Sequence, residues 1–231
     1  FCKERNLQPI NSYREIVKKK DSINLLIIAV TAPNLLKVIN STKKLNCVRL
    51  LEKPMGISLK QAKKIKIISK KKNYFLALNR RMYESTKFAQ KKINEKKIVF
   101  IEDFVNFTLL TKLGFKKKQF KNFIYSHSIH LIDYINIFTR GKIINISKSK
   151  VLINNKKQIH CLIEFSSGDI VIYSCLYHSN TKWKVTLFER NKKIIFQPLE
   201  NATLETRTKS NKFIPKKFDN NFKPGIYNII F

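Results

Sequence analysis

Glycine and long apolar runs are scarce in this chain, and each scarcity excludes a class of protein. Only 5 of the 231 residues are glycine and 6 are proline, which excludes collagen-like and low-complexity disordered chains. The longest apolar run, at residues 25–32, includes a threonine and is far shorter than the roughly 20 residues that span a bilayer. Because 43% of the residues are hydrophobic, we expect a soluble protein with a real core and no membrane segment.

Paired cysteine motifs are also absent. The four cysteines, at positions 2, 47, 161 and 175, are widely spaced and include no Cys-x-x-Cys. This spacing favours reduced thiols that fill a core, although a disulfide pair is left open. Residues 1–5 show no signal-peptide pattern, so we expect a cytoplasmic protein.

Acidic residues are few, and the charge balance permits two interpretations. The chain has 47 Lys and Arg against 15 Asp and Glu, a net charge of +32, which suits either a nucleic-acid binder or a lysine-coated enzyme. Only 8 of the basic residues are arginine, the residue that reads guanine and phosphate with two hydrogen bonds. The lysines also spread along the whole chain, so we expect no specific nucleic-acid partner. Non-specific, salt-sensitive binding to polyanions is expected under either interpretation.

Apolar runs and amphipathic segments alternate through residues 1–80. The runs at residues 23–30, 48–51 and 74–78 predict buried strands, and two helices are predicted between them, the first ending near Leu45. Ser58 and Gln61 form a capping-box pattern at the start of the second helix. This alternation is typical of a parallel, doubly wound sheet, and we predict a Rossmann-like dinucleotide-binding domain at residues 1–80. No Gly-x-Gly-x-x-Gly occurs, so we expect that domain to be truncated, with its first strand and phosphate loop upstream of Phe1.

Residues 81–231 follow a different pattern, in which extended segments dominate. We predict a substrate and oligomerisation domain of the α+β class, with an open, mostly antiparallel sheet. Ser167, Gly168 and Asp169 predict a hairpin turn. Helices are predicted at residues 83–92 and 126–138, a basic loop at 116–121, and extended segments at 98–110, 144–149, 158–165, 170–176, 183–188 and 193–196. The fold class is therefore α/β plus α+β.

Two groups of ionisable residues are candidates for chemistry. Glu52 and Lys53 follow the strand at residues 48–51 and precede Pro54, at the end of the strand where open α/β sheets bind cofactors. The alternative is a charged turn after an ordinary strand. His127, His130 and Asp133 lie at i, i+3 and i+6 of the predicted helix at 126–138. A carboxylate beside an imidazole fixes its tautomer for proton transfer, whereas the alternative is a polar helix start.

The order of these landmarks resembles that of the Gfo/Idh/MocA family, the glucose–fructose oxidoreductase and inositol dehydrogenase group. The resemblance covers essentially the whole chain, and no landmark is specific alone. The landmarks are residues 27–34, Glu52-Lys53-Pro54 before a capped helix, residues 78–83, residues 130–133, the hairpin at 165–168, Trp183 on a strand, and residues 198–200.

The resemblance implies an NAD(P)-dependent dehydrogenase that acts on a sugar, sugar derivative or polyol. Lys53 would relay a proton near the nicotinamide, His130 would contact the reacting hydroxyl or carbonyl, and Asp133 would hold that histidine or the substrate. The cofactor, NAD or NADP, would be lined by Thr31, Pro33 and Asn34, with Glu52 near the nicotinamide ribose. A cis Lys53–Pro54 bond and a homo-oligomer are further expectations from the family. No metal is implied.

One position departs from the family pattern. Many members have an aspartate four residues before the histidine, and this chain has Ser126 there. Serine forms hydrogen bonds but carries no charge near neutrality. A second hypothesis is therefore a catalytically inactive member of the family that serves as a binding or scaffold protein.

Overall fold

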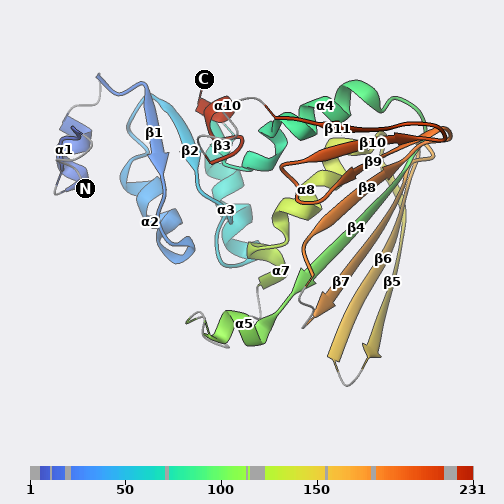
Figure 1. The fold of residues 1–231 in the computed structure, drawn as a ribbon. Helices are drawn as coiled ribbons and strands as arrows, with labels where there is room; N and C mark the ends of the chain where they lie inside the picture. Colours follow the sequence, from blue (N-terminus) through green and yellow to red (C-terminus); the bar gives the residue numbers. More distant parts are fainter. Residues whose placement is uncertain are drawn as a thin grey trace. The chain divides into compact units, whose positions relative to one another are not determined.

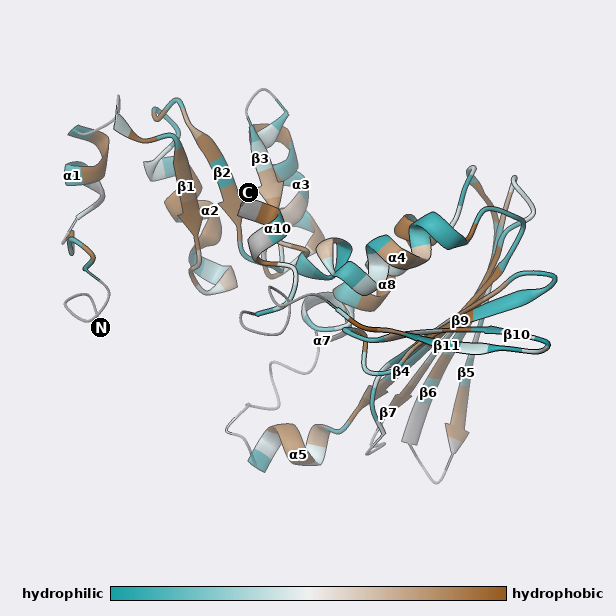
Figure 2. Cartoon of the chain, turned by 45° about the horizontal axis from the view of Figure 1, so that its top comes forward, coloured by the Kyte–Doolittle hydropathy of each residue, from teal (hydrophilic) through white to brown (hydrophobic). Residues whose placement is uncertain are grey.

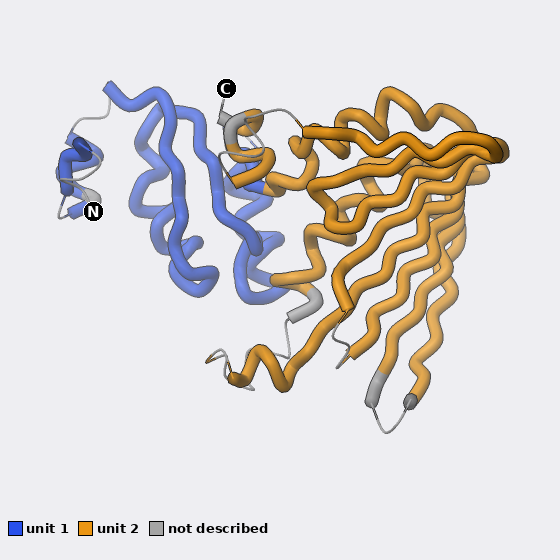
Figure 3. Tube along the Cα trace, in the orientation of Figure 1, with its two compact units in different colours: residues 1–77 blue, residues 78–231 orange. Residues whose placement is uncertain are grey.

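The protein forms two compact units, residues 1–77 and residues 78–231 (Figure 3). In the computed structural model, the described residues are 6–10, 12–18, 22–70, 73–112, 114, 123–153, 156–177, 181–215 and 223–230. The basic loop predicted at residues 116–121 lies outside these ranges, as does Cys2. The other three cysteines carry no disulfide.

The first unit contains a three-stranded parallel sheet in the order β1-β2-β3, as the sequence predicts. Figure 2 shows β1 and β2 as largely apolar strands. Three of the four residues of β2 are buried, but only one residue of β1 and none of β3. The prediction of buried strands is therefore correct for the central strand and wrong for the two outer strands of this sheet. Helices α2 and α3 contribute to one core cluster with the strands, through Leu35, Ile39 and Ile65. The elements are α1 (Tyr13–Lys18), β1 (Leu25–Ile28), α2 (Ala32–Ser41), β2 (Val48–Leu51), α3 (Leu59–Ser69) and β3 (Tyr74–Leu76).

The start of α3 confirms the predicted capping box. The backbone N–H of Gln61 donates to the Ser58 hydroxyl at 3.2 Å, and the Gln61 side chain accepts from the Ile57 N–H at 2.7 Å. Gly56, just before this cap, has φ +101°. A Cβ there would lie 2.8 Å from the Gln61 side chain, so the turn between Pro54 and α3 requires glycine.

A buried arginine sets the end of α2. Arg49 on β2 is 1% exposed, and its guanidinium donates to the backbone carbonyls of Thr42, Leu45 and Cys47 at 2.6 to 2.9 Å. These carbonyls belong to the turn after α2, which ends at Ser41, although the sequence pattern predicted a helix to about residue 45. The arginine therefore replaces the last helical turn with its own hydrogen bonds.

The second unit is an eight-stranded sheet with helices on one face (Figure 1). Its strand order is β11-β10-β9-β8-β4-β7-β6-β5, and every pairing is antiparallel except β4 with β7. The helices are η2 (Asn79–Met82), α4 (Glu84–Lys92), α5 (Phe107–Lys112), α7 (Phe123–Ser126), α8 (Ile129–Phe138) and α10 (Tyr227–Ile230). The strands are β4 (Ile98–Val105), β5 (Ile143–Ile153), β6 (Lys156–Phe165), β7 (Ile170–Tyr177), β8 (Lys184–Phe188), β9 (Lys192–Phe196), β10 (Ala202–Thr206) and β11 (Ser210–Phe213).

The core of this unit lies between α8, α4 and the sheet. Alternate residues of β4 are buried, which is the pattern of a strand with one covered face. Tyr134 and Phe138 of α8 pack against Phe196 of β9, with ring centroids 5.8 and 5.7 Å from that of Phe196. The fold class predicted from the sequence is thus correct: a parallel α/β sheet followed by an α+β unit with an open, mostly antiparallel sheet.

Several predicted element boundaries in this unit are wrong. Residues 98–110 were expected to be extended throughout, but β4 ends at Val105 and α5 begins at Phe107. The Asn106 side chain causes this change, because its oxygen accepts from the Leu109 N–H at 2.9 Å and caps the new helix. The helix expected at 126–138 begins only at Ile129. Trp183, expected on a strand, immediately precedes β8.

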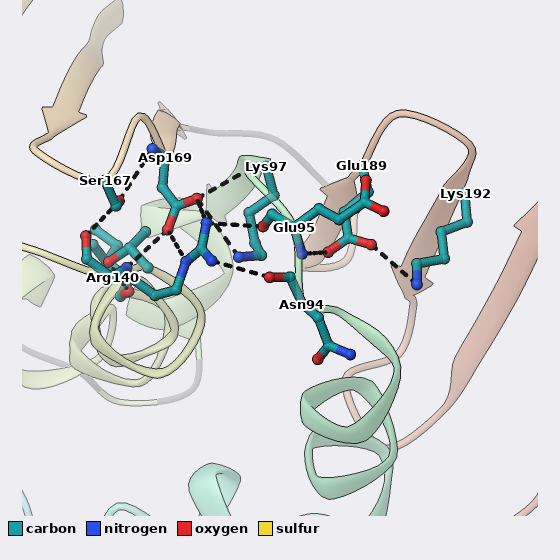
Figure 4. A network of polar contacts seen from close by, with 10 residues as sticks. Asn94, Glu95, Lys97, Arg140, Ser167, Asp169, Glu189 and Lys192 are labelled. Atoms are coloured by element: carbon teal, nitrogen blue, oxygen red, sulfur yellow. Dashed lines mark hydrogen bonds and ion pairs between the residues drawn. The ribbon is translucent and has the colours of Figure 1, made fainter.

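A buried ionic network ties together one end of the sheet (Figure 4). Asp169, in the predicted hairpin turn between β6 and β7, is fully buried and accepts from the Arg140 guanidinium at 2.9 and 3.0 Å. It also accepts from the backbone N–H groups of Arg140 and Lys97. Burial lowers the pKa of the nearby Lys97 ammonium, which lies 3.6 Å from the carboxylate. This one carboxylate therefore connects the hairpin, the end of α8 and the start of β4.

Candidate functional site

The carboxyl edge of the parallel sheet brings the predicted cofactor residues together. The Glu52 N–H donates to the Ile28 carbonyl at 3.0 Å, so the segment after β2 runs beside the segment after β1. Glu52, Lys53 and Pro54 are all partly exposed there. The Lys53–Pro54 peptide bond is cis, which confirms that detail of the sequence-based prediction.

The start of α2 supplies the other three predicted cofactor residues at this edge. Thr31 is the N-cap, with extended φ and ψ of −60° and 143°, and Pro33 occupies the first turn, where its missing N–H is not needed. The Asn34 side chain donates to the Thr31 hydroxyl at 3.1 Å. All three side chains are exposed. Thr31, Pro33, Asn34, Glu52 and Lys53 therefore lie along one edge of the first unit.

The predicted substrate residues His130 and Asp133 lie on α8 of the second unit, and both are buried. Of the predicted catalytic residues, Lys53 lies in the first unit and the other two lie in the second. Arg81 of η2 makes a bidentate pair with Asp133, from Nε to Oδ2 at 2.6 Å and from a terminal nitrogen to Oδ1. From the sequence, Asp133 was expected to hold His130 or the substrate, and its pairing with Arg81 was not expected. Two adjacent arginines, at positions 80 and 81, are visible in the sequence, but their spacing does not indicate that Arg81 pairs with Asp133.

His127 corrects a second part of the sequence analysis. It was placed on one helix with His130 and Asp133, but α8 begins at Ile129 and His127 lies in the turn before it. The i, i+3, i+6 arrangement therefore holds only for the last two residues. Instead, the His127 ring packs on Trp183, with centroids 4.6 Å apart. Ser126, the position that departs from the family pattern, is the last residue of α7.

Asp103 is a buried carboxyl near the start of α8 that the sequence analysis missed. It lies on the core face of β4 and accepts from the Tyr173 hydroxyl at 2.6 Å. Burial raises the pKa of Asp103, although the nearby hydroxyls of Ser128 and Tyr173 and the Trp183 indole oppose that shift. The alternation of β4 was the available signal, because an acid falls on the same face as Val99, Ile101 and Val105.

These groups can transfer protons and form hydrogen bonds with polar ligands. Lys53 carries an ammonium and His130 an imidazole, both of which donate and accept protons in enzymes. Glu52 can accept hydrogen bonds from sugar hydroxyls. No group of three metal-ligating side chains occurs within the described ranges. Nor does any helix in the described part of the chain have the length and apolarity needed to cross a membrane.

Comparisons with known proteins identify the fold. No protein-family model matches the sequence, and no curated protein matches it either. Several solved structures match the fold of this chain. A dehydrogenase (MviM) from Clostridium difficile superposes with a TM-score of 0.80 at 19% identity, over 99% of this chain and 74% of that one.

Two further structures share the fold at lower identity. UDP-N-acetylglucosamine 3-dehydrogenase GnnA from Acidithiobacillus ferrooxidans matches with a TM-score of 0.71 at 11% identity, over 94% of this chain and 70% of that one. An inositol dehydrogenase homolog from Azotobacter vinelandii, complexed with NADH and myo-inositol, matches with a TM-score of 0.67 at 11% identity, over 92% and 63%. The chain therefore has the two-part fold of these dehydrogenases, a Rossmann-like sheet followed by a large open sheet.

Proposed function

We propose that this protein is an NAD(P)-dependent oxidoreductase of the Gfo/Idh/MocA type that acts on a sugar, sugar derivative or polyol. The observation that carries the proposal is the ionisable segment Glu52-Lys53-Pro54 at the carboxyl edge of the parallel sheet, beside the start of α2. In open α/β sheets, this edge is where nucleotide cofactors bind. The fold shared with three dehydrogenases, one of them complexed with NADH and myo-inositol, supports the same proposal.

The residues at the edge fit a nicotinamide cofactor chemically. Pro33 has no N–H and the Asn34 N–H already donates to the Thr31 carbonyl at 2.9 Å, so the exposed Thr31 hydroxyl and Asn34 amide are the polar groups that the start of α2 offers to a cofactor. The partly exposed Glu52 carboxylate can accept hydrogen bonds from ribose hydroxyls. When bound, the nicotinamide exchanges a hydride with the carbon that carries the reacting hydroxyl. Thr31, Pro33 and Asn34 would form the wall of this cofactor site.

The protein side of the reaction is a proton path. As the substrate carbon loses its hydride, Lys53 would take the hydroxyl proton, and in the reverse direction it would return that proton to the carbonyl oxygen. His130 would contact the reacting hydroxyl or carbonyl. Asp133 would fix the first turns of α8 through Arg81, so that the imidazole keeps its orientation. Each of these roles concerns orientation and proton transfer, which typically accelerate a reaction by about 100- to 10,000-fold.

The direct test is a turnover assay with NAD and NADP in parallel against a panel of sugars and polyols. We expect the wild-type protein to reduce one cofactor with at least one substrate, and His130→Ala to lower kcat roughly 100-fold. His160→Ala is the matched control, because His160 is a half-buried histidine of the same unit that contacts Ser174 on the open sheet. Loss of the same size in both variants, or none in His130→Ala, would contradict the assignment. Tight nicotinamide binding without turnover on any substrate would favour the inactive binding-protein hypothesis instead.

We also propose that the protein is a homo-oligomer through the open face of the large sheet. That face exposes Ile98, Val151, Leu162 and Phe188, which the strand register places on the side away from α8. Exposed apolar patches of this kind mark protein–protein contacts. We expect light scattering to give an oligomeric mass and Leu162→Asp to reduce it. Ile146→Asp, at an exposed apolar residue on the opposite face, should not; a monomeric wild-type protein would refute the proposal.

A further inference from the structure

Two adjacent arginines of η2 have different environments. Arg81 pairs with the buried Asp133. Arg80 forms no ion pair or hydrogen bond through its guanidinium within the described ranges, and its Nε is buried without a hydrogen-bond partner. Its guanidinium carbon instead lies 5.0 Å from the centroid of the Trp183 ring and 6.0 Å from that of Tyr83. The two side chains therefore differ in the one feature that matters for anion binding, the presence of a carboxylate partner.

The aromatic contacts do not satisfy Arg80. A guanidinium on the face of a ring gains about 0.5–2 kcal/mol, but the ring offers no acceptor in the plane of the five N–H donors. A buried donor without an acceptor costs about 1–3 kcal/mol. Phosphate and carboxylate oxygens have the geometry to accept two parallel hydrogen bonds from such a fork. Arg80 is thus held in position by aromatic rings, and within the described ranges its buried Nε has no acceptor.

The acid that contacts Tyr83, Glu200, already has a hydrogen-bond donor. Glu200 accepts a hydrogen bond from the Tyr83 hydroxyl at 3.2 Å and makes no ion pair with Arg80 in the part of the chain that the structure describes. The charge of Glu200 acts on Tyr83, where burial raises the pKa to about 12. No described residue therefore supplies an acceptor to the Arg80 guanidinium, and a ligand oxyanion could take that place.

Arg80 is linked to the candidate substrate residues through Trp183. The Trp183 ring also contacts the ring of His127, which precedes the helix that carries His130. η2 also packs against α8. A cation, an imidazole and a flat aromatic ring therefore gather at the start of α8. This combination suits a ligand that directs an anionic substituent to the arginine.

We propose that Arg80 and Trp183 form a subsite for an oxyanion, a phosphate or carboxylate group, carried by the sugar-like substrate. The proposal rests on the proposed function, because it places the subsite beside the residues assigned to substrate. It narrows the substrate class from sugars and polyols in general to their phosphorylated or acidic derivatives. It also gives the two adjacent arginines separate tasks: Arg81 holds α8, and Arg80 recognises the ligand.

The test uses Trp183, the only tryptophan of the chain, as a built-in fluorescent reporter. Glucose, glucose 6-phosphate, glucuronate and inorganic phosphate are titrated into the full-length protein at constant ionic strength. We expect saturable changes in Trp183 emission, with a Kd for at least one anionic sugar about tenfold or more below that for glucose. The phosphate and carboxylate ligands then distinguish the two kinds of oxyanion.

Variants separate a specific subsite from the general positive charge. Arg80→Gln should raise the Kd for the anionic sugar about tenfold, the effect of losing roughly 1.4 kcal/mol, and leave glucose binding unchanged. Arg190→Gln removes the same charge from an exposed position of the same unit and should change neither. If Arg80→Gln fails to fold, Arg80→Lys keeps the charge without the fork and should still weaken anionic binding. Equal binding of glucose and anions, or equal effects at positions 80 and 190, would overturn the subsite.

The outcome of this experiment does not depend on the proposed function, because ligand binding followed by Trp183 fluorescence requires neither cofactor nor turnover. Arg80-dependent binding of an anionic sugar in a protein without dehydrogenase activity would support the subsite and contradict the enzyme. Turnover of neutral sugars without any dependence on Arg80 would support the enzyme and overturn the subsite.

Discussion

We expect Lys53→Ala to lower kcat roughly 100- to 10,000-fold while leaving the Kd for the nicotinamide cofactor nearly unchanged. Lys53 stands at the carboxyl edge of β2, in the position proposed for proton transfer, and alanine provides no group that accepts or returns a proton. The remaining proposed cofactor residues, Thr31, Pro33, Asn34 and Glu52, are untouched by the change. Steady-state kinetics with saturating cofactor, together with cofactor titration by calorimetry, measure both quantities.

The matched control for this variant is Lys37→Ala on α2. Lys37 is an exposed lysine of the same unit, so its removal changes the net charge equally without touching the edge of the sheet. We expect its kinetics to equal those of the wild-type protein. Unchanged turnover in Lys53→Ala would remove Lys53 from the proposed mechanism, and a proportionate loss of cofactor binding would make it a binding residue instead.

The second large effect concerns stability: Asp169→Ala should lower the free energy of unfolding by about 3–5 kcal/mol. The Asp169 side chain is 0% exposed, and its removal leaves the Arg140 guanidinium and the buried Lys97 ammonium without their carboxylate. Two backbone N–H groups lose their acceptor as well. Chemical denaturation followed by far-UV circular dichroism measures this free energy.

Glu205→Ala supplies the contrast. Glu205 pairs with Lys193 at 2.8 Å, with side chains 31% and 40% exposed, and exposed pairs contribute about 0–1 kcal/mol. We therefore expect a small change in that variant. Similar losses in both variants would show that burial of the Asp169 network does not determine its contribution.

The same carboxylate predicts how stability depends on pH. Burial by itself raises the pKa of Asp169, but the hydrogen bonds from Arg140 and the charge of Lys97 outweigh burial and bring the pKa down from 3.8 to about 2. A carboxyl with a lower pKa in the folded state stabilises that state at pH values above 3.8. This contribution, about 2 kcal/mol, is lost as the pH falls toward 2. In Asp169→Asn, the free energy of unfolding, measured by chemical denaturation at a series of pH values, should lack this decrease as the pH falls toward 2.

Features encoded in short stretches of sequence were predictable. The three parallel strands were recognised from short, largely apolar runs, although only the central strand, β2, is mostly buried. Ser58 and Gln61 act within one helical turn, and the hairpin at Gly168 has φ +82°, which glycine adopts readily. In each case, the residues that cause the structure are neighbours in the chain.

Features that depend on distant residues were not predictable. Arg81 and Asp133 are 52 residues apart, and no periodicity connects them. Arg49 lies in an apolar strand as an apparent exception, and only the folded turn shows the carbonyls that it binds. The strands β10 and β11 are polar at the edge of the sheet, so they lack the apolar run that identified the inner strands. The candidate site depends mainly on contacts of this distant kind.

The pairing of β4 has a consequence for how the chain folds. Its two partners in the sheet, β7 and β8, lie far along the sequence, and the Lys97 N–H reaches Asp169 across 72 residues. A strand of this kind stays without both neighbours until the intervening chain is present and has closed a long loop, which makes folding slow. In the first unit, by contrast, each strand pairs with the next along the chain. During synthesis, the parallel sheet of the first unit can therefore form early, whereas the centre of the large sheet can form only after most of the second unit has been made.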